Sequence, residues 1–148
     1  MHQNPFTYQF EADLLALILE LELFPEERIW TSYDGFPNSA GILFRHLTGN
    51  LNHFFGHYIG HNGYQRDRVR EFQNQGLPKK QMLEELEAAK SLTIEILEGM
   101  SPDLMDQPYT AVEFSHFSPT HLQALIKLST HLSYHLGQID AMRRVVGS

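Results

Sequence analysis

The sequence predicts an all-α protein, a four-helix bundle with two long connections. Three observations lead to this prediction: apolar residues recur at steps of three and four along four stretches, residues that start or stop helices flank those stretches, and the chain has 148 residues. No stretch can bury its apolar side alone, so the four most simply pack together. A chain of this length buries about 70% of its unfolded surface, and we expect one domain over residues 1–148.

The first two helices are predicted in the N-terminal part of the chain. Apolar residues recur with helical spacing over residues 6–24, and Pro25 then ends the pattern because proline lacks the amide donor that a helix needs. A second pattern starts after Ser39, a residue type that caps helices well, and continues to Tyr58, before Gly60. We therefore expect one amphipathic helix on each side of the segment between residues 25 and 38.

The other two helices are predicted in the C-terminal part. A third pattern opens at Pro78 and keeps one apolar face as far as Met100, while its opposite face is rich in glutamate and lysine. A fourth pattern opens at Ser118, a capping residue that is followed by Pro119 in the first turn, and it continues to Val146. Both patterns are typical of helices with one buried side and one solvated side.

Two connections are longer than is usual in helix bundles. Residues 60–77 and residues 101–117 both exceed the two to eight residues that normally join bundle helices. We expect each connection to hold a crossover, a short ordered turn or part of a site. Within the second connection, residues 112–117 are expected to form a short extended piece.

Gly49 and Gly137 each lie inside a predicted helix. Glycine in a helix interior costs about 1 kcal/mol relative to alanine. That cost is offset where a neighbouring helix or a second subunit approaches the backbone closely. We therefore expect a close contact at both positions.

Composition and charge exclude several classes of function. The chain carries a formal charge of -7, and its basic residues form no cluster apart from the segment Arg66–Arg70, which argues against nucleic acid as a partner. The apolar run over residues 14–23 contains Glu20 and Glu22, lacks the features of an export signal, and is too short to span a bilayer. Since the chain also has no cysteine, we expect a soluble, cytoplasmic protein without a membrane partner.

His131 and His135 form the most informative pattern in the sequence. They stand four residues apart, so a helix directs both imidazoles the same way, about one turn apart. Neutral imidazole binds zinc, nickel, copper and iron(II). His46 is the best candidate for a third ligand, because it holds the corresponding flanking place on the second helix. On a helical wheel the paired histidines border the apolar face, as residues lining a groove would.

The abundance of histidine leaves other interpretations open. The chain has nine histidines, and His53, His57 and His61 form two further pairs with the same spacing on the second helix. Together with His46 these residues make a polar stripe that is a rival site. We expect His53, His57 and His61 to face solvent or a dimer partner. The His131 and His135 pair can also be read as ordinary edge histidines.

Three segments resemble the DinB-like superfamily of metal-binding four-helix bundles, which includes bacterial low-molecular-weight thiol transferases that depend on bacillithiol or mycothiol. The resemblance covers most of the chain and rests on the segments 45–51, 66–72 and 131–138. It implies that His46, His131 and His135 bind one divalent metal ion, zinc or nickel. It also implies a homodimer.

Three other residues are candidates for substrate binding. Gln138 lies about one turn beyond His135 and can orient a ligand or a substrate by hydrogen bonding. Arg66 and Arg68 can hold an anionic substrate group, or they can pair with Asp67 and Glu71 to fix the long connection. We favour the structural pairing for these arginines.

The leading functional hypothesis is a metal-dependent enzyme that transfers a small thiol to an electrophile. Three nitrogen ligands without a fourth protein ligand are typical of a catalytic metal site. The residues between the paired histidines include no glutamate, so the metalloprotease motif is absent and no catalytic residue is assigned. The alternatives are a non-catalytic metal-binding or stress-related helical dimer, and a metal-free helical interaction module.

Overall fold

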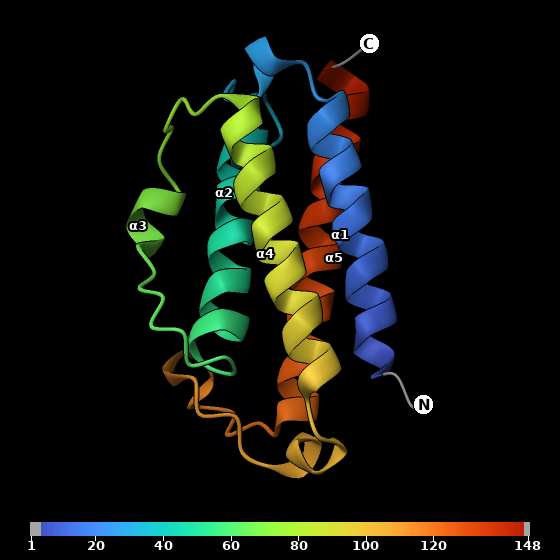
Figure 1. The fold of residues 1–148 in the computed structure, drawn as a ribbon. Helices are drawn as coiled ribbons and strands as arrows, with labels where there is room; N and C mark the ends of the chain where they lie inside the picture. The colour runs from blue at the N-terminus through green and yellow to red at the C-terminus, as the bar shows by residue number, and fades with distance from the viewer. Residues whose placement is uncertain (1–3, 147–148) are drawn as a thin grey trace.

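Four long helices form the body of the protein in the computed structural model, which describes residues 4–146 (Figure 1). These helices are α1 (Pro5–Leu23), α2 (Ala40–Leu51), α4 (Lys79–Gly99) and α5 (His121–Val146). The shorter elements are η1 (Glu26–Arg28), η2 (Asn52–His57), α3 (Arg68–Glu71), η3 (Pro102–Asp106) and η4 (Val112–Phe114). The predicted all-α bundle with two long connections is confirmed. None of the helices described has the length and apolar character that crossing a membrane requires.

The first long connection is a crossover. In Figure 1, α1 and α5 run upward while α2 and α4 run downward, so the chain must return along the whole bundle between α2 and α4. The returning segment contains α3 and stands beside α2. Its end is tied to the N-terminal part of the chain, because Trp30 Nε1 donates to the carbonyl of Leu77 over 3.0 Å.

Helix boundaries follow the capping residues of the sequence. The Asn4 side chain accepts from the amide of Phe6, and Ser39 Oγ accepts from the amide of Ile42 at 3.2 Å. The helix α5 starts at His121, later than Ser118, because Pro119 first accepts a backbone hydrogen bond from Tyr109 at 2.9 Å. The four predicted helices are therefore present, with shifts of a few residues at their ends.

Two local predictions are refined by the structure. The second helix does continue beyond Leu51, but as the π-helical turn η2, in which the amide of Tyr58 bonds to the carbonyl of His53 at 3.2 Å. The extended piece expected over residues 112–117 is wrong. Residues 112–114 form the 3₁₀ turn η4, and the amide of Phe117 continues it by bonding to the carbonyl of Phe114 at 3.0 Å.

The core lies along the axis of the bundle and positions the helices that carry the candidate site. Leu14, Leu17 and Leu21 of α1 are fully buried, and they belong to one apolar cluster with residues of the other three long helices. Burial of each such side chain contributes about 1.5–3 kcal/mol. Since α1 packs against both α4 and α5, it holds α5 at a fixed place relative to the rest of the bundle.

Leu17→Ala is expected to lower the free energy of unfolding by about 2–5 kcal/mol, because it removes a fully buried side chain from close packing. Leu19→Ala on the same helix is the matched control, since Leu19 is 52% exposed and its truncation should change stability by less than about 0.5 kcal/mol. Urea denaturation of both variants measures the difference. Equal losses would contradict the packing described here.

Candidate metal centre

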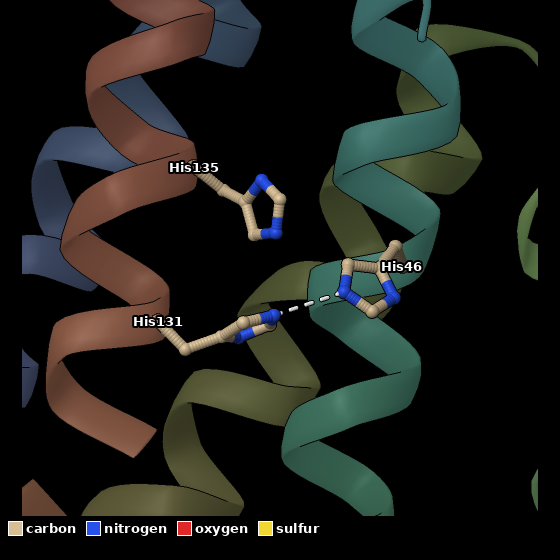
Figure 2. Close-up of side chains that lie close together, drawn as sticks. All are labelled: His46, His131 and His135. Atoms are coloured by element: carbon tan, nitrogen blue, oxygen red, sulfur yellow. Dashed lines mark hydrogen bonds between the residues drawn. The ribbon is translucent and has the colours of Figure 1, made fainter. Parts of the chain in front are cut away.

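Three histidine side chains from α2 and α5 point toward one another in the space between these two helices (Figure 2). His46 comes from α2, and His131 and His135 come from successive turns of α5. One ring nitrogen from each residue lies within 4.8 Å of the others. The Nε2 atoms of His46 and His131 are 3.0 Å apart. The structure thus brings together the three residues that the sequence singled out.

The environment keeps the paired histidines in their neutral form. Burial, reinforced by the nearby His135 and His46, lowers the pKa of His131 to about 3. Burial also lowers the pKa of His135, although its hydrogen bond with Gln138 acts in the opposite direction. Near neutral pH both rings therefore keep a nitrogen lone pair that can bind a cation.

A buried carboxylate fixes the orientation of His46. The Nδ1 of His46 lies 3.1 Å from Oε1 of Glu71, and Arg66 donates to the same carboxylate through Nε at 2.7 Å and Nη2 at 2.9 Å. Burial acts to raise the pKa of Glu71, but the hydrogen bonds from His46 and Arg66 outweigh it and hold that pKa below its usual value. An ionised Glu71 accepts the Nδ1 proton, so the Nε2 lone pair of His46 faces the other two rings.

Gln138 plays the same part for His135. Its Oε1 lies 2.7 Å from Nδ1 of His135, which can donate to it, and the Nε2 lone pair is then left for a ligand. The structure therefore places Gln138 against a candidate metal ligand. The Nδ1 of His131 is buried and has no hydrogen-bond partner within residues 4–146.

The donor set fits a divalent transition-metal ion. Bonds of about 2.0–2.1 Å in a tetrahedral arrangement put ligand atoms about 3.4 Å apart. The observed nitrogens lie within 4.8 Å of one another, and one pair is 3.0 Å apart, so their spacing is close to that of such a site. No other described carboxylate or imidazole joins the group, so a fourth position stays open. Without an ion, the 3.0 Å contact between His46 and His131 is satisfied by an N–H···N hydrogen bond.

The predicted pairing of the connection arginines is correct for Arg66, whose guanidinium is held by Glu71 inside the protein. Arg68 is exposed and lies over the ring of Phe72, 5.2 Å from its centroid. Both arginines line the pocket next to the histidines. The sequence indicated this segment, but only the fold separates the buried arginine from the exposed one.

The close approach expected at Gly49 is present. A Cβ atom on this residue would lie 2.1 Å from Oε2 of Glu71, so only glycine leaves room for the carboxylate. The approaching group is a side chain of α3 and not a neighbouring bundle helix. At Gly137, a Cβ would meet no atom of the described chain within 4 Å.

The expectation that His53 faces outward is wrong. This side chain is only 9% exposed, and its Nε2 lies 2.6 Å from Oε1 of Glu113 in η4. His57 is partly buried, and its ring is parallel to that of His53 with 5.8 Å between centroids, whereas His61 is exposed. Of the histidines in this stripe, His53 is therefore the one that η4 of the second long connection contacts.

A pocket of about 610 Å³ opens beside the three histidines. Its lining includes three residues that the sequence analysis did not select: Phe54, Glu113 and Lys127. Lys127 had a detectable signal, since it precedes His131 by four residues and therefore lies on the same face of α5. The positions of Phe54 and Glu113 depend on how η2 and the second connection fold.

A comparison with protein families identifies a family for most of the chain. Residues 19–147 match the model of a family described as a protein of unknown function (DUF1572). The chain belongs to this family. The match includes His46, Glu71, His131 and His135, so the whole candidate centre lies within the DUF1572 region. No curated protein matches the chain.

Gly49→Ala is expected to push the Glu71 carboxylate away from His46 and to lower the free energy of unfolding by about 1–3 kcal/mol. Gly137→Ala is the matched control, because it adds the same methyl group inside a helix where there is open space. It should raise stability by up to about 1 kcal/mol. Thermal and urea unfolding test the pair, and a stabilised Gly49→Ala would contradict the crowding at Glu71.

Proposed function

We propose that this protein is DinB-like and holds one divalent zinc or nickel ion on His46, His131 and His135. The observation that carries the proposal is the cluster of three ring nitrogens within 4.8 Å of one another. Two features support it. Burial favours neutral rings at His131 and His135, and hydrogen bonds to Glu71 and Gln138 direct the Nε2 lone pairs of His46 and His135.

The choice of metal follows from the donor atoms. The chain has no cysteine, so a soft thiolate site is excluded, and the three grouped donors are all imidazole nitrogens. Imidazole suits zinc and nickel better than it suits magnesium or calcium, which prefer oxygen ligands. Three protein ligands with a fourth position open are also the usual arrangement of a catalytic zinc ion.

We further propose that the protein is an enzyme that transfers a low-molecular-weight thiol to a small electrophile. A bound divalent ion would supply Lewis acidity and lower the pKa of a thiol. The residues of the chain have separate tasks. Glu71 and Gln138 hold ligand histidines in orientation, Arg66 keeps the charge of Glu71 balanced, and the adjoining pocket receives the substrate. We also propose that the protein forms a homodimer and is located in the cytoplasm.

A second candidate function is a metal-binding dimer without catalysis. The buried network of Glu71, Arg66 and His46 favours it, because it ties α2 to the crossover, and an ion on His46, His131 and His135 would join α5 to the same network and stabilise the bundle. Spectroscopy of the cobalt-substituted protein separates the two functions. An exchangeable water on cobalt supports the enzyme, and a sphere filled by protein ligands supports the structural role.

Protein purified without a histidine tag or added metal is expected to contain close to one zinc or nickel ion per chain. His46→Ala and His131→Ala should each lose the ion, because two remaining imidazoles bind it far more weakly. His116→Ala, which removes an exposed histidine from the second connection, is the control and should keep it. Elemental analysis gives the stoichiometry. Equal metal content in all four proteins would reject the site.

The metal-loaded protein is expected to accelerate the loss of a small thiol in the presence of electrophiles by at least about tenfold over the metal-free protein. The rate of thiol consumption should fall to the metal-free level in His131→Ala. The assay needs several cellular thiols and both aromatic and aliphatic electrophiles. If no combination reacts faster with the loaded protein, the catalytic proposal fails and the proposed metal site is unaffected.

A further inference from the structure

Two cationic side chains at the pocket are not paired with a carboxylate of the part of the chain that the structure describes. Lys127 lies on α5, one turn before His131 and on the same face of the helix, and Arg68 lies at the start of α3. Both line the pocket beside the histidines. Neither forms an ion pair with any residue in the range 4–146.

The other charged side chains of this pocket are engaged inside the protein. The guanidinium of Arg66 donates two hydrogen bonds to the Glu71 carboxylate, at 2.7 and 2.9 Å. Glu113 lies 2.6 Å from the imidazole of His53. Two cations are therefore left for a ligand, although the chain as a whole carries a charge of -7. Such a local reversal of sign attracts a negatively charged group.

The wall of the same pocket is aromatic. Phe54 and Phe114 stack in parallel planes with 5.0 Å between ring centroids, and Phe72 stays 37% exposed while its ring packs 4.8 Å from that of His46. Leu128 completes the apolar lining. Surfaces of this kind bind the apolar body of a small molecule, and a few polar groups then fix its orientation.

We infer that this pocket takes a small molecule with an apolar or aromatic body and one carboxylate group. Lys127 and Arg68 bind the carboxylate, and the phenylalanine wall packs the body, which leaves the far end of the molecule at the three histidines. Arg66 is neutralised by Glu71, so the lining has two unpaired cations and one carboxylate, Glu113, and its surplus is one positive charge, which a single carboxylate neutralises. The inference rests on the proposed function in one respect: it names the electrophilic substrate of that site.

The test compares 3-phenylpropanoate with its uncharged amide by isothermal titration calorimetry on zinc-loaded protein. The carboxylate is expected to bind about tenfold more tightly than the amide, because charge-assisted hydrogen bonds exceed neutral ones by about that factor. Lys127→Met should remove most of this preference, and Arg68→Gln should reduce it independently. Lys80→Met, an exposed lysine at the start of α4 outside the pocket, is the control and should keep it.

The same titrations on chelator-treated protein identify the group that binds the carboxylate. A preference that persists without metal and disappears in Lys127→Met supports the inference. A preference that needs metal and survives Lys127→Met assigns the carboxylate to the ion and overturns it, as does equal binding of acid and amide. If the preference follows Lys127 but no thiol is consumed in the assay above, the binding site stands and the proposed function fails. If the protein transfers a thiol but binds the carboxylate no more tightly than the amide, the inference is wrong and the proposed function stands.

Discussion

The charge of Glu71 is the constraint on which the candidate centre depends. A carboxylate buried in protein must be paired, and here a bidentate guanidinium and one imidazole provide the pairing. The carboxylate fits only because Gly49 has no side chain at the point of contact. Since the imidazole concerned is His46, its proton is drawn to one side of the ring and its lone pair is left on the other. The buried charge of Glu71 therefore determines the direction in which the Nε2 lone pair of His46 points.

Chain topology explains why the pocket is lined by loops as well as helices. Because α2 and α4 run parallel, the segment between them has to travel the length of the bundle, and it passes the open side of α2 (Figure 1). That passage supplies Glu71, Arg66, Arg68 and Phe72 to the site. The second connection closes the other edge through Glu113 and Phe114. The two unusually long connections thus form part of the pocket wall, and α2, η2 and α5 form the rest.

Much of this arrangement could be predicted from the sequence, and the reason is periodicity. Apolar spacing located the four helices, and the spacing of His131 and His135 placed both rings on one face of a helix. The other features of the site depend on the path that the chain takes through the folded protein, which local spacing does not reveal. Nothing local to Glu71 indicates that it reaches His46, 25 positions away. His53 is buried and contacts Glu113 of η4, and the place of η4 against the second helix could not be predicted from local spacing.

The three grouped histidines all come from α2 and α5, and α1 and α4 contribute none. The bundle therefore has one half that carries the candidate metal centre and another half that supports it. Substitutions on the outward surfaces of α1 and α4 can accumulate without touching the candidate centre, provided that the inward leucines are kept. This division leaves the two outer helices free to be redesigned for stability or for attachment to other molecules while the arrangement of the three imidazoles is retained.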